Sequence, residues 1–434
     1  MFGLSLLLIF AWKWPLRALY ACFGAVLLGG MKFRMRSAGA VLEGSVDTQI
    51  LFELAVYGAI GLAACTAAVA LRLHRRRLRP VEWVLVAYAT WALASVGWSR
   101  SPTLSGVRAL QLVVLTVFLL ALTRADLPGR ILRTTSRTYS AFVVGAAAMA
   151  LLFPWAAGGT VDYFSGAGRF GWFSDHPITV AMHAGTAALL ILSVSSYSRQ
   201  EPRLSILGNL VGWMALALCC GVLLMTGSRG PAAALLSAGV VLVAARLLTP
   251  SYALAMALLT GAAVTAALMF PGPPQGVLQS LGLESTAIAR FALRGGSLDH
   301  LASFSGRLDL WKGAAAVALQ SPVIGQGFIA SRGALLEVAH WGGHAHNGPM
   351  QSVLDLGIVG AGLLWTAVFV QLARFLLASP VDTESRRVRL AVIGILSFLL
   401  LASVTDPGIA GPPGALPMMG LMALLVPLDA GART

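Results

Sequence analysis

The sequence predicts an all-α polytopic membrane protein with about 12 transmembrane helices, and two features of its composition carry that prediction. Of the 434 residues, 57% are hydrophobic and only 11% are charged. Soluble domains carry about 25% charged residues, so this chain has too few charges to cover a surface that faces water. Runs of about 20 apolar residues, each long enough to cross a bilayer, recur along the chain. We therefore expect one membrane-embedded domain over residues 1–434 rather than several soluble domains.

The apolar windows locate the expected helices. They are roughly residues 17–32, 49–71, 81–98, 104–122, 138–157, 177–195, 204–226, 231–248, 251–270, 349–375, 388–404 and 412–428. The segment 2–12 is apolar but too short to cross alone, so we expect an interfacial turn or half of a tight hairpin. No cleavable signal peptide is expected, because this run continues into further spans without a small-residue cleavage site. Adjacent Cys219 and Cys220 are poorly placed to pair, so no disulfide framework is expected.

The positive charges predict the orientation of the chain. A net charge of +14 suggests nucleic acid, but the basic residues lie in short loops between apolar spans, as topology signals do. The loop 72–79 contains five arginines and should face the cytoplasm. The other loops that this assignment places inside are 123–137, 196–203 and 376–387, and each contains arginines. Both termini then lie in the cytoplasm. The loop 33–48 is an exception, because it should be outside yet begins near Lys32, Arg34 and Arg36.

The segment 271–348, between the ninth and tenth spans, is the only sizeable region that this arrangement leaves outside the membrane. It is too long for a plain connector, and we expect it to be a periplasmic loop that carries short amphipathic helices. Residues 307–319 have such a helical pattern, with Ser305 as a plausible N-cap and Pro322 as a stop signal.

Histidines lie at the end of this loop, directly before the tenth span. A neutral histidine such as His346 at a water-accessible boundary is a reasonable general base, because its pKa lies near the working pH. Gln351 and Asp355 follow one helical turn apart, so they share a face. An acid inside an apolar span is costly, so Asp355 marks either a functional site or a contact that holds helices together.

A metal site built from His340, His344 and His346 is the weaker reading of the same cluster. The chain contains no HExxH motif, and Gly342 and Gly343 oppose a helix at this point. The sequence also contains no GxSxG motif, no Walker A loop and no dinucleotide fingerprint. We therefore expect no metal and no cofactor.

Three outer segments add arginines. Arg229, in the turn 226–231, needs a counter-charge or an anionic ligand, unless it reaches lipid phosphates. Arg307 begins the amphipathic helix and is either a second anion-binding group or part of a solvated face. Arg169 and His176 either join the same site or have local roles, with Arg169 anchoring its loop and His176 capping the helix near Pro177. Because the guanidinium fork matches phosphate oxygens, these groups suit a diphosphate leaving group beside a histidine base.

The chain resembles the O-antigen ligase and polymerase superfamily of bacterial membrane glycosyltransferases, over about residues 80–365 by motif. The matching blocks are Gly227-Ser228-Arg229-Gly230, then Gly306-Arg307 with Trp311, Pro322 and Gly325-Gln326-Gly327, then His346-Asn347 with Leu354, Gly357 and Gly360. Weaker landmarks are Trp98-Ser99 with Pro102, and Gly171 with His176-Pro177.

The resemblance implies an inverting, metal-independent transfer of glycan from an undecaprenyl-diphosphate carrier at the periplasmic face of the inner membrane. By carry-over, Arg229 and Arg307 would bind the diphosphate and His346 would activate the acceptor hydroxyl. Asn347 would orient His346 or close the helix start. The residues from which further substrate contacts are expected are Arg169, His176, Asn347, Gln351, Asp355 and Trp311.

The acceptor is open between two enzymes of the superfamily. The string Ser303-Phe304-Ser305-Gly306-Arg307 and the His344-Ala345-His346-Asn347 block look more like a repeat-unit polymerase of O-antigen or exopolysaccharide, with a chain-length regulator as a candidate partner. A ligase, which attaches the glycan to the lipid A core, shares the same His-Asn pair. A lipid or solute transporter is the alternative from another class, but the chain shows no matching halves with broken helices.

Overall fold

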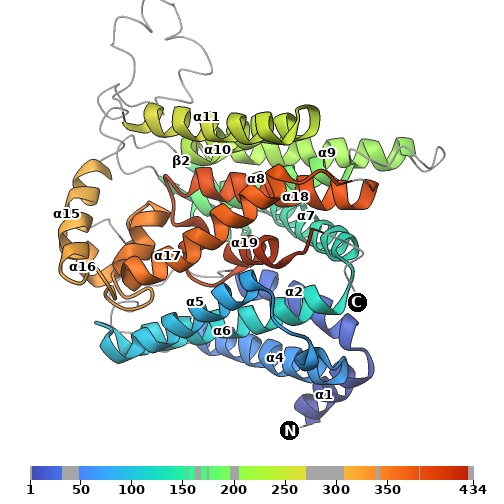
Figure 1. The fold of residues 1–434 in the computed structure, drawn as a ribbon, viewed down its shortest axis with the longest axis horizontal. Helices are drawn as coiled ribbons and strands as arrows, with labels where there is room; N and C mark the ends of the chain where they lie inside the picture. Colours follow the sequence, from blue (N-terminus) through green and yellow to red (C-terminus); the bar gives the residue numbers. More distant parts are fainter. Residues whose placement is uncertain are drawn as a thin grey trace, which may run out of the picture.

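Long helices make up most of the structure, a computed structural model that describes residues 2–31, 48–153, 155–161, 168–173, 175–195, 205–269, 307–338, 343–380 and 382–428. The first helices of the chain form one half and α8–α11 the other, with α17, α18 and α19 between them (Figure 1). Close contacts join α17 to α5, and α18 to both α8 and α10. The fold is therefore held together by its last helices, which pack against both halves.

A helix lies in each of the apolar windows. The helices are α2 (Pro15–Gly29), α4 (Thr48–Ala70), α5 (Pro80–Ala94), α6 (Pro102–Ala125), α7 (Pro128–Leu152), α8 (Pro177–Ser195), α9 (Ser205–Met225), α10 (Arg229–Leu247), α11 (Pro250–Met269), α17 (Gly348–Leu377), α18 (Thr383–Ala402) and α19 (Ala415–Leu425). Proline occupies the first turn of several of them, where its missing N–H costs no hydrogen bond.

The structure therefore confirms a predominantly helical fold with apolar helices, as expected of an all-α membrane protein. Among the described residues, five helices are long and apolar enough to cross a bilayer, by length and composition. They are Thr48–Ala70, Pro80–Trp98, Pro102–Ala125, Arg229–Leu247 and Gly348–Leu377. That all the predicted spans cross a membrane stays a prediction.

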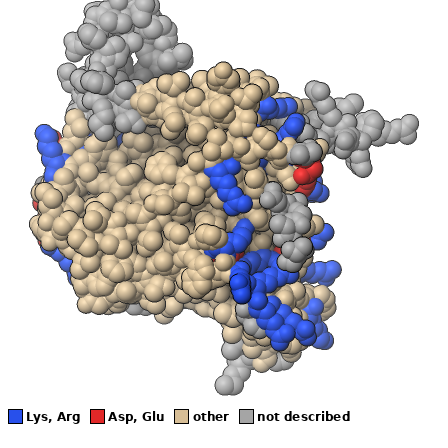
Figure 2. All heavy atoms as spheres, in the orientation of Figure 1, with Lys and Arg blue, Asp and Glu red and all other residues tan. Residues whose placement is uncertain are grey.

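The basic loops lie together at one end of the bundle. Arg76 Nη1 lies 3.2 Å from the carbonyl oxygen of Arg124, which joins the loop 72–79 to the end of α6. Arg133, in α7, pairs with Glu384 at the start of α18 at 2.7 Å. Arg389 donates to the carbonyl of Ala245 near the end of α10 at 2.7 Å. Lys and Arg gather on this face (right in Figure 2), which we call the basic end. Of the loops predicted inside, 72–79, 123–137 and 376–387 therefore meet at one end, and 196–203 lies outside the described residues. The side of the membrane on which this end lies stays a prediction.

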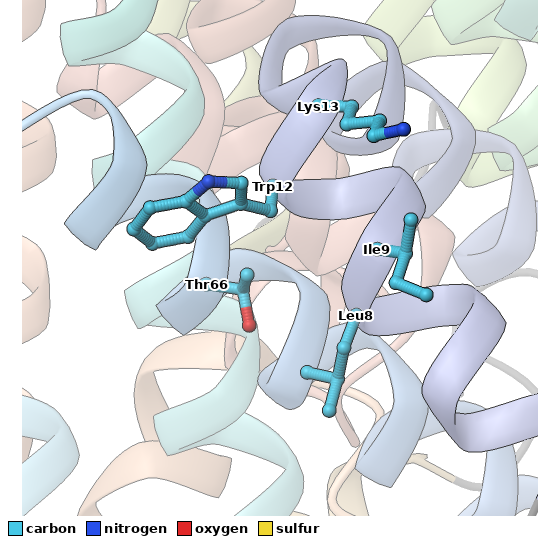
Figure 3. Close-up of a pocket in the computed structure, with 5 residues that line it drawn as sticks. All are labelled: Leu8, Ile9, Trp12, Lys13 and Thr66. Carbon is cyan, nitrogen blue, oxygen red and sulfur yellow. The ribbon is translucent and has the colours of Figure 1, made fainter.

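The segment 2–12 forms a helix, α1 (Phe2–Lys13), which runs into α2 with a break at Trp14. The backbone N–H of Trp14 still donates to Phe10 at 2.8 Å across the break. An apolar pocket of about 330 Å³ lies between α1 and α4, lined by Leu8, Ile9, Trp12, Lys13 and Thr66 (Figure 3). Because Thr66 is about one turn before the end of α4, this pocket belongs to the basic end.

The outer loop before α8 differs from the prediction of a simple loop. It contains an antiparallel pair of strands, β1 (Ala157–Val161) and β2 (Gly168–Trp172), in which Thr160 lies opposite Arg169. Strands of five residues lack the length of apolar alternation that makes a strand visible in sequence. Trp172 is buried at the end of β2 and seats the hairpin against the helices.

The described part of the outer loop 271–348 contains α15 (Arg307–Leu319), with the bounds that the sequence predicts, and α16 (Arg332–Val338). The N-cap predicted at Ser305, the remaining residues of 271–306, and the histidine at 340 lie outside the described residues, as does the basic exception in the loop 33–48.

The long helix α17 is broken at Gly357, whose φ of 64° lies in the left-handed region that favours glycine. The chain 322–328 fills the break. The N–H groups of Gln326 and Gly327 donate to the carbonyls of Leu354 and Asp355 at 2.8 and 2.9 Å, and Ile358 N–H donates to Pro322 at 2.9 Å. The break leaves few backbone groups unsatisfied, which is what permits irregular backbone inside an apolar bundle. These hydrogen bonds attach the outer loop to α17 about three turns after His346.

Candidate active site

His346 lies in the short loop that leads into α17, at the end of the bundle opposite the basic end. Its φ is 49°, a left-handed conformation that residues other than glycine rarely adopt. Ala345, directly before it, is held on both sides: its N–H donates to Gln351 Oε1 at 2.8 Å, and its carbonyl accepts from Trp311 Nε1 at 2.9 Å. A strained backbone persists only where the surroundings hold it, and here α15 and α17 supply those contacts.

Asn347 fixes the other side of His346. Its Oδ1 accepts from the backbone N–H of Met350 at 2.9 Å, which makes Asn347 the N-cap of α17. Its Nδ2 donates to the carbonyl of Val404 at 3.2 Å, in the loop after α18. Gly348 continues this contact, since its N–H donates to Ser403 at 2.6 Å. One of the two expectations for Asn347, closure of the helix start, is confirmed.

Gln351 and Asp355 share a face of α17, as the sequence predicts, and lie 2.8 Å apart between Nε2 and Oδ2. Both are buried. Gln351 Nε2 also donates to Ser331 Oγ at 2.9 Å, and Asp355 Oδ1 accepts from the N–H of Ser331 at 3.3 Å. These contacts attach the start of α16 and the loop before His346 to α17. A role in binding substrate stays a prediction for both residues.

Electrostatic contacts place His346 beside three cationic or titratable groups. Burial lowers the pKa of His346 well below its usual value, and the charges of His344, Arg307 and His176 lower it further. The rings of His344 and His346 are 3.9 Å apart between centroids. The structure therefore brings together residues from α15, from the loop before α8 and from the start of α17. A histidine in these surroundings is neutral at pH 7 and available to accept a proton.

Asp406 belongs to the same cluster, and the sequence reasoning missed it. It lies in the loop 403–411 after α18, where burial raises the pKa of its carboxyl group while the charges of Arg307 and His176 oppose that rise. Its Oδ1 accepts from the N–H of Gly408 at 3.1 Å. The available signal was an acid in a short outer loop that otherwise lacks charge.

Arg229 begins α10, after the N-cap residue Ser228. The next residue, Gly230, packs so closely on Thr405 that a Cβ atom would overlap its hydroxyl group. Thr405 is adjacent to Asp406, so the start of α10 lies against the loop that holds the carboxylate. The structure thus brings Arg229 to the same end as His346, through a loop and not through sequence proximity.

Arg169 and His176 both have the local contacts that were their alternative readings. Arg169, on β2, donates from Nε to the carbonyl of Thr226 at 2.9 Å and from Nη2 to Ser228 Oγ at 2.8 Å. It anchors the hairpin on the turn before α10. His176 Nδ1 accepts from the N–H of Ile178 at 3.3 Å and so caps the start of α8. Neither contact excludes a ligand, and substrate binding by both residues stays a prediction.

Within the described part of the chain, no group of three or more His, Cys, Asp or Glu side chains has an arrangement that would hold a metal ion. Arg307, His176 and His346 lie close together here, with the half-buried carboxylate of Asp406 beside Arg307 and His176. Such an arrangement can neutralise an anion while a nearby neutral imidazole accepts a proton.

Residues 214–365 match a family model described as O-antigen ligase. The match supports a relation of this segment to the O-antigen ligase and polymerase superfamily. No curated protein sequence matches the chain. The apolar helices and this match together indicate a multi-pass membrane protein.

The matched segment runs from α9 to the middle of α17 and so contains much of the site. Arg229, Arg307 and His346 lie inside it, together with the glycines of the broken helix. The hairpin with Arg169 and the loop with Asp406 lie outside it, so their place in the site rests on the contacts of this chain.

Proposed function

We propose that this protein belongs to the O-antigen ligase and polymerase superfamily and is an inverting glycosyltransferase that uses an undecaprenyl-diphosphate-linked glycan as donor. The observation that carries the proposal is the position of a half-buried His346, whose surroundings favour its neutral form, beside Arg307 in the segment that matches the family model. A base and a guanidinium group side by side are the two functions that transfer from a diphosphate requires.

The step is a single displacement at the anomeric carbon of the donor sugar. His346 accepts the proton of an acceptor hydroxyl, and the hydroxyl oxygen forms the new glycosidic bond. The bond between the anomeric carbon and the diphosphate oxygen breaks, and its electron pair leaves with undecaprenyl diphosphate. Attack from the face opposite the leaving group inverts the anomeric centre. Proton transfer to a positioned base typically accelerates such a step by about 10²–10⁴-fold.

In this proposal Arg229 and Arg307 bind the diphosphate and stabilise the charge that develops on it. The guanidinium fork matches two phosphate oxygens, and positively charged groups aimed at a leaving group stabilise it without metal. Asp406, which faces Arg307 and His176, orients Arg307 and balances its charge before the donor binds. It is a positioning residue, because its carboxylate would repel the diphosphate itself.

For the acceptor, we propose a further repeat unit that is itself lipid-linked, which makes the enzyme a polysaccharide polymerase. The second candidate, transfer to the lipid A core, is favoured by the description of the matching family model, O-antigen ligase. Deletion of the protein followed by analysis of glycans separates them. A polymerase leaves single lipid-linked repeat units, whereas a ligase leaves lipid-linked polymer and an unmodified lipid A core. Unaltered surface glycans would refute both.

The proposed site faces the periplasm, with the basic end and both termini in the cytoplasm. Support comes from the segregation of basic loops to one end (Figure 2), which is the distribution that the positive-inside rule describes. Single cysteines at Met225, an exposed residue beside the turn before α10, and at His344, in a chain whose own cysteines are replaced, should both react with a membrane-impermeant maleimide added from the periplasm. Labelling of only one of them would refute a shared outer site.

A further inference from the structure

Arg332, the first residue of α16, has a half-buried guanidinium group whose Nε atom is inaccessible to solvent and has no hydrogen-bond partner. Among the described residues, no carboxylate forms an ion pair with it. Burial lowers the pKa of Arg332, and no charge from the described residues offsets that effect. Since burying a cation without a partner is costly, a group retained in this state suits a ligand that supplies the missing negative charge.

The surroundings fix Arg332 next to the candidate catalytic loop. Ser331, directly before it, is buried and bound to both Gln351 and Asp355 of α17. On the other side, a Cβ atom placed on Gly343 would lie 3.4 Å from the Cζ and Nη2 atoms of Arg332. Gly343 is three residues before His346, and three residues span at most about 10–11 Å. The guanidinium group therefore packs against the loop that carries the candidate base.

We propose that Arg332, packed against the glycine backbone at residue 343, forms an oxyanion subsite that binds a phosphate or carboxylate group of one of the two glycan substrates. The proposal rests on the proposed function, because it takes the glycan transfer at His346 as given. It adds a specificity-determining residue to Arg229 and Arg307. The ligand chemistry is an oxyanion, because a planar guanidinium fork binds two oxygens of one such group. Its source is either the diphosphate of the donor or an acidic substituent of the acceptor glycan.

Initial rates with the full-length protein in lipid nanodiscs test the proposal, with the lipid-linked donor and the acceptor from the native host varied separately. Arg332→Gln should raise the KM for one substrate at least about tenfold, the change that one lost charge-assisted contact produces. The KM of Arg332→Lys should lie between those of the native protein and Arg332→Gln, since lysine keeps the charge but loses the planar fork. A higher KM for the donor identifies the carrier diphosphate, and a higher KM for the acceptor identifies an acidic group on that glycan.

A matched pair at residue 343 tests the same subsite without removing the arginine. Gly343→Asp places a competing carboxylate against the guanidinium group and should raise the same KM as Arg332→Gln. Gly343→Asn adds nearly the same volume without charge and should raise that KM clearly less than Gly343→Asp. Equal effects of Asp and Asn would show a steric effect only and would overturn the subsite.

Thermal unfolding without substrates gives a readout that does not depend on activity. Arg332→Gln should unfold at the same temperature as the native protein or higher, because it removes a buried charge that lacks a partner. A large loss of stability would show instead that Arg332 supports the fold. An unchanged KM for both substrates, whether kcat falls or not, would also overturn the proposal. This is the result expected if Arg332 binds only the phosphate of a phospholipid. His346→Ala, assayed in parallel, separates the two levels: an active His346→Ala refutes the proposed function, whereas an inactive one beside a native-like Arg332→Gln refutes only the subsite.

Discussion

Asn347 allows the most detailed prediction, because its two hydrogen bonds hold the backbone next to His346. Asn347→Ala removes the N-cap bond to Met350 and the bond to Val404. The cap contributes about 1 kcal/mol, and the second bond contributes about 1 kcal/mol more. The substitution should therefore lower the free energy of unfolding by about 2 kcal/mol. It should lower kcat more strongly, by about ten- to a hundredfold, since a base that moves by about 1 Å loses activity on that scale.

Two variants separate positioning from general stability. Asn347→Asp keeps an acceptor for Met350 but loses the donor to Val404, so it should unfold between the native protein and Asn347→Ala. Asp382 caps α18 at the basic end through Ser385 N–H at 2.8 Å, and Asp382→Ala removes a comparable cap far from His346. Denaturation and initial rates should show destabilisation with native kcat for Asp382→Ala. Native kcat in Asn347→Ala, or an equal loss of kcat in Asp382→Ala, would refute the positioning role.

Three further predictions concern charge, pH and the broken helix. Arg229→Lys should be nearly as inactive as Arg229→Ala in a transfer assay, because lysine lacks the bidentate fork. Normal turnover in the lysine variant would show that only the positive charge of Arg229 is needed. Since the pKa of His346 is lowered and only the neutral ring accepts a proton, kcat/KM should stay flat from neutral pH to below the ordinary histidine pKa, and His344→Phe should move the acid limb to higher pH. An acid limb in the native protein above about pH 6.5 would contradict this. Gly357→Ala should lower the free energy of unfolding by at least about 1–2 kcal/mol, because φ is positive and Val323 leaves no room for a Cβ atom. Gly362→Ala, in the same helix with open space around it, should not lower it. Equal stability of the two variants in a denaturation experiment would argue against the break at Gly357.

The helices of this protein could be predicted because their signals are local. A run of apolar residues long enough to span a bilayer, ended by Pro or by a cluster of arginines, needs no knowledge of the rest of the chain. The bounds of α8 follow from this alone, and those of α15 follow from an equally local amphipathic pattern before Pro322. The amide cap at Asn347 is equally local, since it depends on the residue three positions later.

The features that sequence reasoning missed depend on contacts between distant segments. The break at Gly357 exists because the chain 322–328 supplies hydrogen bonds to both sides of it, and nothing near Gly357 in sequence indicates that. Asp406 is the clearest case in the site. Its loop looks like a short connector, and only the packing of Gly230 on Thr405 and of Gly348 on Ser403 brings it beside Arg307. The hairpin was missed because strands of five residues carry too few alternating positions.

The most direct test of the central claim is the release of undecaprenyl diphosphate from a lipid-linked glycan by purified protein in nanodiscs, with His346→Ala and Arg307→Ala compared with the native chain. The account predicts that both variants reach the membrane in native amounts and release no carrier, while the native protein releases one carrier for each glycan transferred. Full activity in both variants would contradict it, because neither the base nor the guanidinium group that defines the site would then take part in the transfer.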